Sequence, residues 1–461
     1  MLRLNETQQR RATLLMVMLN AFSTPIMLSA ANVALPSVAE ALEIDAVALS
    51  WVPMAYLTAS AMFVLIFGRV ADMFGRKRVF LLGTVSVILT SLIAASAQNE
   101  MWLISGRFLQ GISAAMLYAT QVAIISSIYP PEQRGQMIGL AVSGIYFGLM
   151  LGPIFGGSLI ELFGWRASFV LHIPLCLIVI VIGLVAVSGE WRAEERGSFD
   201  IRGAGIYAAS ILALMLGVSW LPALSGVITL GLGLIGAWWF FHHEHRHPHP
   251  IFDVELFYTN RIFTMSCMAS LLMYTGTYAN VVLISLYLQY LKDFPPLATG
   301  FVMMAQPLIM ALCSPFAGRL SDRVEPRVIA SAGMSATAIG LFALSELDTN
   351  SSLIGILGCL LVTGLGFSLF TSPNANAIMG SVGKGQYGAA AGSVAVMRVV
   401  GQMASMGLVA MVFALVIGPV EITPAVHEQL SRAISLAFVC AAVACLPGIG
   451  FSLARGRLRE T

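Results

Sequence analysis

Long apolar runs separated by short polar segments dominate the chain, and this pattern predicts membrane-spanning helices. A helix needs about 20 mostly apolar residues to cross the hydrocarbon core of a bilayer. The pattern therefore predicts about fourteen spans, with ends uncertain by a few residues. These spans are residues 12–35, 48–68, 79–97, 102–126, 136–160, 168–188, 203–221, 224–241, 262–290, 297–317, 328–346, 352–379, 387–418 and 433–453.

The composition excludes a soluble protein. Of the 461 residues, 58% are hydrophobic and only 10% are charged, whereas soluble domains carry about 25% charged residues. Such a chain must use lipid as solvent for much of its surface. The net charge of +2 gives no reason to expect a nucleic-acid partner.

The distribution of Lys and Arg predicts the orientation in the membrane. When the N-terminus is placed inside and the sides alternate, only Arg166, Lys292 and Arg432 fall outside, while Arg107 and Arg398 lie within spans. All others of the 25 Lys and Arg residues fall inside, as expected for cytoplasmic loops. We therefore expect a multi-pass protein of a bacterial cytoplasmic (inner) membrane, with both termini in the cytoplasm.

A short internal repeat predicts two related halves. Gly68-Arg-x-x-Asp72 follows the second span, and Gly318-Arg-x-x-Asp322 follows the tenth. Parallel repeats of this kind build transporters around a central site. We predict an N-terminal six-helix bundle (1–190), a two-helix insertion (191–261) and a C-terminal six-helix bundle (262–461).

Three motifs suggest specific chemistry. In the first, Gly68 to Arg78, the glycines allow unusual backbone angles, and Asp72 at a membrane edge needs a cationic partner or a helix N-terminus. Such a cluster can hold one state of a moving protein, although plain anchoring by positive charge explains it equally well. The second motif surrounds Arg107, where a charge within a span costs at least about 2.5–3.5 kcal/mol and demands a partner or a wet cavity.

The third motif is a run of small residues in the fifth span. Gly144, Gly148, Gly152 and Gly156 form one smooth helix face for close contact. Pro153 removes a backbone donor and favours a kink. Tight packing alone is a sufficient physical explanation for this run.

Nearly the whole chain resembles the major facilitator superfamily, in particular its branch of fourteen-helix drug:proton antiporters. The resemblance implies an all-α membrane fold of two six-helix bundles plus two inserted helices. It implies that Asp72 and Arg76 hold the cytoplasmic gate, and that Arg107 participates in substrate and proton coupling. The glycine–proline run resembles the signature of exporters in this family, so it points to outward transport.

One departure from the family matters. The family's first span carries an acidic residue before Asn-Val-Ala-Leu-Pro, but here Met27 occupies that position ahead of Asn32. No Asp or Glu falls in the middle of any predicted span. Coupling to protons then needs an edge group, for which Glu40, Glu161 and His172 are the candidates. Arginines without acids also favour neutral, zwitterionic or anionic substrates over dications.

Polar residues inside spans are candidates for the translocation path. For each one, hydrogen bonding between helices is an equally good explanation. Asn374 and Asn376 beside Pro373 are expected to mark a broken helix end. The candidates are Asn32, Arg107, Gln110, Gln121, Tyr146, Tyr274, Tyr278, Asn280, Gln306, Asn374, Asn376 and Arg398.

A histidine-rich stretch, residues 242–249, follows the eighth span. We expect a solvated or headgroup-facing loop without a bound metal ion, and a transition-metal site is the alternative. We identify no nucleophile–base constellation, no His-Glu-x-x-His pattern and no phosphate-binding loop, so we expect neither an enzyme nor a cofactor.

The sequence thus predicts a transporter that exports amphipathic small molecules, of the multidrug efflux and antibiotic-resistance type, by alternating access and proton antiport. Its expected partners are a small-molecule substrate, protons, the lipid bilayer and a periplasmic adaptor. The alternatives are an exporter or flippase of one endogenous metabolite or lipid, a facilitator without proton coupling, and a membrane sensor that does not transport.

Overall fold

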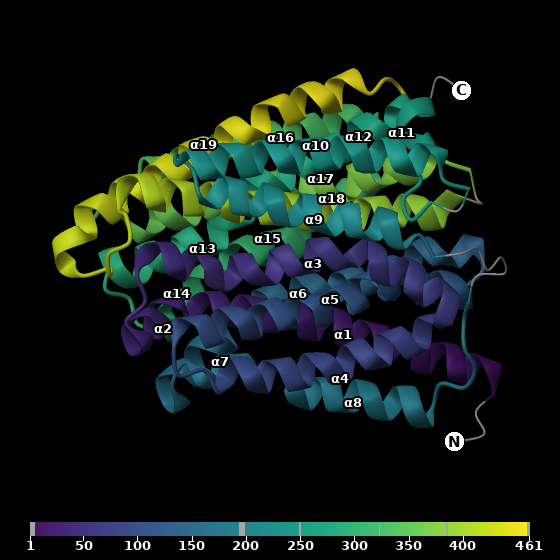
Figure 1. Ribbon diagram of the computed structural model, residues 1–461, viewed down its shortest axis with the longest axis horizontal. Coiled ribbons are helices and arrows are strands. Elements are labelled where there is room, and N and C mark those ends of the chain that lie inside the picture. Colours follow the sequence, from purple (N-terminus) through teal and green to yellow (C-terminus); the bar gives the residue numbers. More distant parts are fainter. Residues whose placement is uncertain (1–4, 193–198, 249, 322, 384–385, 459–461) are drawn as a thin grey trace.

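The computed structural model describes residues 5–192, 199–248, 250–321, 323–383 and 386–458, and these are almost entirely helical (Figure 1). Within them, fourteen helical segments are long and apolar enough to cross a membrane, which confirms the predicted number. The first helix begins and the last helix ends at the same end of the bundle in Figure 1, as an even number of spans requires. Two residues singled out in the sequence, His249 and Asp322, lie outside the described residues.

The first six spans form the lower part of the bundle in Figure 1. The sixth span is interrupted at His172, where Pro174 cannot donate a backbone hydrogen bond to the preceding turn. A short helix also follows the first span. These elements are α1 (Glu6–Val33), α2 (Leu35–Leu42), α3 (Ala46–Phe74), α4 (Arg76–Ala95), α5 (Glu100–Ile128), α6 (Pro131–Phe163), α7 (Arg166–Val170) and α8 (Ile173–Val185).

The insertion consists of α9 (Ile201–Ser219) and α10 (Leu224–Arg246), followed by the short α11 (Glu255–Thr259). Helix α9 packs against α3 and α18, so it contacts spans from both ends of the sequence. One such contact is a hydrogen bond of 2.7 Å from the Tyr207 hydroxyl to the carbonyl of Ala61. The proposed division of the chain into three parts stays a prediction.

The last six spans form the upper part of Figure 1. The ninth span breaks at Tyr278, and the tenth breaks at Met304. By contrast, the twelfth span continues through Pro373, so the predicted broken end beside Asn374 is wrong. These elements are α12 (Arg261–Thr277), α13 (Ala279–Leu286), η1 (Tyr287–Leu291), α14 (Pro296–Met303), α15 (Ala305–Ser321), α16 (Pro326–Ser345), α17 (Leu353–Gly380), α18 (Tyr387–Val416), η3 (Pro424–Val426) and α19 (His427–Ala454).

The glycine run of α6 packs against α1 as the sequence predicts. A methyl group at Gly156 would lie 2.7 Å from the Cα of Ala30, and one at Gly148 would overlap the carbonyl of Phe22. Another face of α6 contacts the C-terminal spans. A methyl group at Gly157 would overlap α14, and one at Gly300 would overlap α6. Helix α6 is therefore held tightly between α1 and α14 by small residues.

The N-terminal and C-terminal spans are joined by hydrogen bonds at the end opposite to the termini. Ser285 donates to the carbonyl of Asn32 (3.0 Å), and Gln289 donates to that of Val33 (3.0 Å). The backbone N–H of Ala46 donates to the carbonyl of Val420 (3.0 Å). These contacts close the end that the charge pattern assigns to the outside.

Candidate functional site

Arg107 on α5 is the centre of a buried polar cluster. Its side chain is fully buried, and its Nε donates to the carbonyl of Val52 at 3.1 Å. Its Nη1 donates to the side-chain oxygen of Gln110, and its Nη2 has no hydrogen-bond partner among the described residues. A buried arginine held only by neutral acceptors leaves a net positive charge in a medium of low dielectric.

Aromatic rings surround this guanidinium. Its Cζ lies 4.6 Å from the ring centroid of Tyr56 and 5.9 Å from that of Phe169. The hydroxyls of Tyr56 and Tyr118 lie 2.9 Å apart, and Arg398 of α18 stands 5.2 Å over the ring of Tyr118. Tyr118 thus lies between the two intramembrane arginines predicted for the site, and ring faces partly offset their charge.

A second arm of the cluster runs from Gln110 to His172. The amide nitrogen of Gln110 lies 2.7 Å from the Ser91 hydroxyl, which lies 3.1 Å from Nε2 of His172. The same amide lies 3.0 Å from the sulfur of Met27. The position where the family carries an acid therefore belongs to this cluster, and a buried histidine is linked to it through Ser91.

Tyrosines of the C-terminal spans face the same region. Tyr278, at the break between α12 and α13, interacts electrostatically with Arg107. Tyr274 of α12 and Tyr146 of α6 interact electrostatically with Arg398. The structure therefore brings six of the predicted residues together where the two sets of spans meet: Arg107, Gln110, Tyr146, Tyr274, Tyr278 and Arg398.

Four other predicted residues are occupied in contacts between helices. Gln121 of α5 donates to Asn20 of α1 at 2.5 Å, and Asn280 of α13 donates to Gln306 of α15 at 2.6 Å. Asn32 is buried in α1, where its carbonyl accepts the Ser285 hydroxyl. Whether these residues also contact a substrate stays a prediction.

Asn374 and Asn376 lie away from the Arg107 cluster, near the end of the bundle that carries the termini. Asn374 donates to Ser270 at 2.9 Å and accepts from the buried Arg455 at 2.7 Å, while Asn376 donates to Ser321 at 2.6 Å. Burial lowers the pKa of Arg455 to about 10, against the attraction of the Glu325 carboxylate. These side chains fasten α17 to α12, α15 and the chain following α19.

The first motif forms a rigid turn between α3 and α4. Arg76 pairs with Asp72 (2.8 Å) and reaches across to the Ser127 hydroxyl on α5 (2.6 Å). Gly75 adopts φ +122°, a conformation that favours glycine, and a side chain there would overlap Glu190. The roles of Asp72 and Arg76 in gating, together with Gly68 and Gly318 in the repeat, stay predictions.

The three candidate coupling groups have different environments. Glu40 is exposed on α2. Glu161 is also exposed, and its carboxylate accepts the backbone N–H of Leu297 at 2.9 Å, which ties α6 to the start of α14. His172 is 1% exposed and is the one of the three that is linked to the Arg107 cluster.

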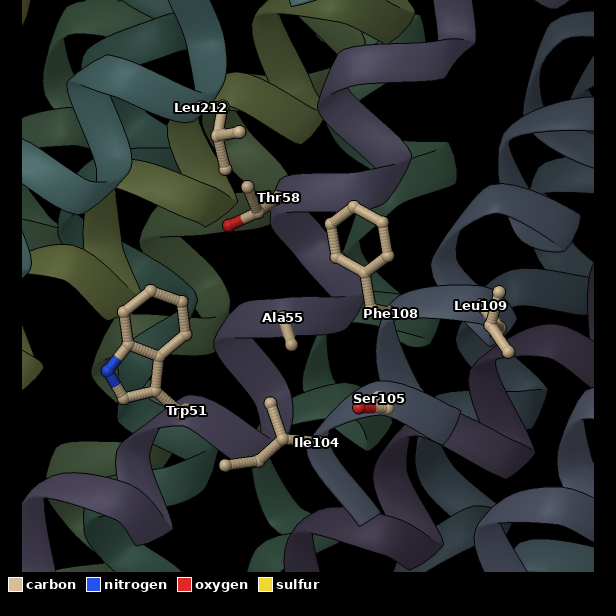
Figure 2. A pocket seen from close by; sticks show the side chains of 8 residues that line it. All are labelled: Trp51, Ala55, Thr58, Ile104, Ser105, Phe108, Leu109 and Leu212. Carbon is tan, nitrogen blue, oxygen red and sulfur yellow. The ribbon is translucent and has the colours of Figure 1, made fainter. Parts of the chain in front are cut away.

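A pocket of about 360 Å³ lies between α3, α5 and the inserted α9 (Figure 2). Its lining is mostly apolar and includes Trp51, Ile104, Phe108 and Leu212. It is distinct from the polar cluster, since neither intramembrane arginine lines it. Such a lining suits an apolar chain or ring and carries no charged group.

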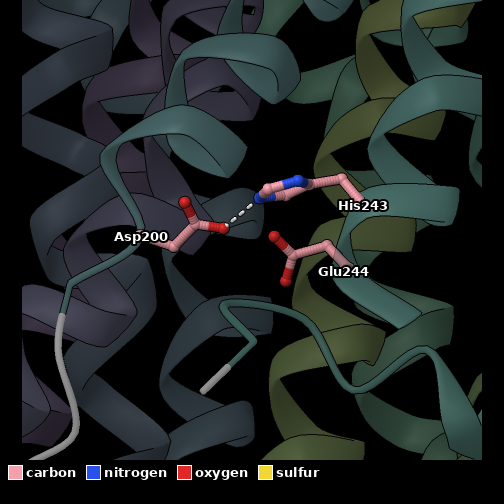
Figure 3. Close-up of side chains that lie close together, drawn as sticks. All are labelled: Asp200, His243 and Glu244. Atoms are coloured by element: carbon pink, nitrogen blue, oxygen red, sulfur yellow. Dashed lines mark hydrogen bonds and ion pairs between the residues drawn. The ribbon is translucent and has the colours of Figure 1, made fainter. Parts of the chain in front are cut away.

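The prediction of a solvated loop at residues 242–249 is wrong for residues 242–246. Helix α10 continues to Arg246, and Glu244 is only 2% exposed. His243 lies 2.7 Å from Asp200, which starts α9 (Figure 3). Burial alone would raise the pKa of Asp200, but the Gly203 N–H and the His243 ring outweigh it and hold that pKa below its ordinary value.

Sequence reasoning missed several residues of both clusters. Ser91 gave no signal, because serine is common in apolar helices. Asp200 lies between two predicted spans, where an acidic residue gives no signal of a site. The expectation that no His-Glu-x-x-His pattern is present is wrong, because His243-Glu244-x-x-His247 has this spacing, and two histidines four residues apart share one helix face.

Comparison with known proteins gives consistent results. A family model described as Major Facilitator Superfamily matches residues 17–203 and 201–406. Riboflavin transporter RibZ of Clostridioides difficile (strain 630) is 30% identical over 382 residues, covering 81% of this chain and 82% of that protein. Drug efflux pump JefA of Mycobacterium tuberculosis (strain CDC 1551 / Oshkosh) is 24% identical over 456 residues, covering 93% and 86%.

Among solved structures, the crystal structure of peptide transporter POT in complex with sulfate has a similar fold. Its TM-score is 0.69 at 15% sequence identity, and the match covers 98% of this chain and all of that one. At this identity the likeness concerns the fold alone.

Proposed function

We propose that this chain, which belongs to the Major Facilitator Superfamily, exports neutral, zwitterionic or anionic amphipathic molecules. The observation that carries the proposal is Arg107, which is fully buried and held by neutral acceptors only. A cargo with an acceptor or anionic group would satisfy the free Nη2, and the tyrosine rings would take its apolar part. The proposal includes no catalytic step.

The proposed mechanism is alternating access around this cluster. Tyr146 and Tyr274 come from α6 and α12, so a cargo between them would contact both sets of spans. The hydrogen bonds from Ser285 and Gln289 would break and re-form as the outer end opens and closes. We place the closed end at the periplasm of a bacterial inner membrane, where a periplasmic adaptor is an optional partner, and the termini in the cytoplasm.

We further propose His172 as the proton-coupling group in place of the missing acid. Among Glu40, Glu161 and His172, it is the buried one, and it reaches Arg107 through Ser91 and Gln110. Protonation of its ring would add a positive charge beside Arg107. Antiport requires that proton and cargo exclude each other. Protonation would turn Nε2 of His172 from an acceptor into a donor toward Ser91, and we propose that the altered Ser91–Gln110 arm then binds the cargo less tightly.

The test is flux of fluorescent amphipaths in proteoliposomes, with anionic, neutral and dicationic dyes of similar size. We expect flux of anionic and neutral dyes, increased by an imposed pH gradient. Best transport of lipophilic dications would contradict the proposal. Flux indifferent to pH would retain export but replace antiport with facilitation, and no flux of any cargo would favour the sensor alternative.

A single metabolite is the second candidate cargo. The relative that is 30% identical is named a riboflavin transporter, and stacked or edge-on tyrosines suit a planar aromatic ring system. Riboflavin is fluorescent, so the same assay tests it directly. Riboflavin flux well above that of every dye would make the chain a metabolite exporter.

A further inference from the structure

We propose that Asp200, His243, Glu244 and His247 form a binding site for a divalent transition-metal ion, with Zn²⁺ as the best-fitting ion. The site lies where α9 begins and α10 ends (Figure 3), away from the Arg107 cluster. One potential ligand atom from each of Asp200, His243 and Glu244 lies within 4.8 Å of the others.

In each of the two carboxylates, backbone N–H groups hold one oxygen, and the other oxygen is available to the proposed ion. Oδ1 of Asp200 accepts the backbone N–H of Gly203 (2.9 Å), while Oδ2 faces Nε2 of His243 (2.7 Å). Oε2 of Glu244 accepts the N–H groups of Ile251 (2.6 Å) and Phe252 (3.0 Å). Such outer hydrogen bonds orient the ligands in protein metal sites.

The other oxygen of Glu244 indicates that this site lacks a cation. Its Oε1 is buried and has no hydrogen-bond partner among the described residues, although the whole residue is only 2% exposed. Figure 3 shows the Glu244 carboxylate directed toward Asp200 and His243. Two buried carboxylates side by side repel each other, and a divalent cation between them removes that repulsion.

The histidines complete the ligand set. Nε2 of His247 lies 3.9 Å from Oδ2 of Asp200, on the same side as His243. Two imidazoles and two carboxylates suit Zn²⁺, which binds four such ligands at about 2.0–2.2 Å. Ligand atoms of a tetrahedral site lie roughly 3.3 Å apart, so His243 and Asp200 must separate slightly. The two histidine side chains are 24% and 22% exposed, which gives the ion a route of entry.

Gly203 keeps the space between the carboxylates open. A methyl group there would overlap both Oδ2 of Asp200 and Oε1 of Glu244. A Gly203→Ala change therefore obstructs the site without removing a ligand. The ligands come from the start of α9 and the end of α10, and Glu244 also accepts backbone N–H groups of the segment before α11. The bound ion would therefore fasten the insertion at its junction with the C-terminal spans.

The test is Zn²⁺ titration of the full chain, purified in detergent without a polyhistidine tag, stripped with a chelator and measured against a chromophoric chelator. We expect one high-affinity Zn²⁺ ion per chain. His243→Ala and Gly203→Ala should each weaken binding by about tenfold or more. Asp200→Asn should do the same, and it retains a good helix cap.

His245→Ala is the matched control, because His245 is exposed on the same turn and lies against the ring of Tyr258. It should bind Zn²⁺ as the unmodified chain does. Absence of high-affinity Zn²⁺ binding would overturn the proposal. So would Asp200→Asn and Gly203→Ala variants that bind Zn²⁺ as tightly as the unmodified chain does. Either result would leave a hydrogen-bonded network around Asp200, His243 and Glu244 without a bound ion. Dye flux reports on the transport function independently.

Discussion

Arg107 in α5 and Asp200 at the start of α9 are both buried charges, but the groups around them differ in sign. Arg107 contacts only carbonyl, amide and aromatic groups, and one of its nitrogens is without a partner in the described structure. Asp200 lies beside a second buried carboxylate, Glu244, and beside imidazoles that are neutral unless protonated. One cluster has an excess of positive charge and the other an excess of negative charge.

This difference in sign indicates what kind of ligand would balance the charge of each cluster. Buried charges are normally paired, because desolvation costs several kcal/mol for an unpaired ion. The Arg107 cluster lies where the two sets of spans meet, and under the proposed alternating access a mobile cargo would reach it there. The Asp200 cluster lies at the end of a helix pair, where two partly exposed histidines would admit an ion that then stays bound.

The largest expected effect comes from removing the positive charge of the first cluster. Arg107→Gln should reduce flux of an anionic dye by about 100-fold, since a hydrogen bond to a charged group contributes roughly 1.5–3 kcal/mol. Flux of a neutral dye should fall much less. Arg432→Gln is the control, because Arg432 is exposed and pairs with Glu428. Equal losses for both dyes would indicate a structural role for Arg107.

A smaller effect should follow from placing an acidic residue at position 27, where the family carries one. In Met27→Glu, the new carboxylate would lie beside Gln110, whose amide is 3.0 Å from the Met27 sulfur. It would neutralise Arg107 and shift preference from anionic toward cationic dyes by about tenfold, an ordinary magnitude for one close charge pair. Met27→Leu controls for the change in packing. An unchanged ratio of anion to cation flux would contradict a charge-selective cluster.

The sequence predicted the fold better than the two clusters, for physical reasons. The spans follow from hydropathy, which acts locally along the chain, whereas the orientation inferred from the Lys/Arg bias stays a prediction. Arg107 was found because any charge in a span is costly, and Arg398 for the same reason. Ser91 and Met27 became members of the cluster only through contacts between helices distant in sequence. The break at His172 was readable from Pro174, whereas the intact helix at Pro373 shows that proline alone does not fix a break.

The third prediction concerns coupling within the first cluster. His172→Gln keeps a hydrogen-bonding group opposite Ser91 but cannot take up a proton. Dye accumulation driven by a gradient of one pH unit, worth up to about tenfold for one proton, should disappear. Exchange of dye without a gradient should persist. Retained gradient dependence would exclude His172 and leave Glu161→Gln as the next variant to measure.

The smallest effect is expected at the second cluster, where the ligand is structural. Zn²⁺ at 100 times its dissociation constant stabilises a folded protein by about 2.7 kcal/mol, which corresponds to roughly 5 °C or less in Tm for a chain of this size. Adding a chelator should lower the Tm of the unmodified chain by that amount and that of Asp200→Asn by about half of it or less, because tenfold weaker binding leaves at most about 1.4 kcal/mol of stabilisation. Flux of the anionic dye should be the same in both. If the chelator shifts the Tm of both proteins equally, the ion acts elsewhere on the chain, and the carboxylates of Asp200 and Glu244 are stabilised by their hydrogen bonds to backbone N–H groups instead.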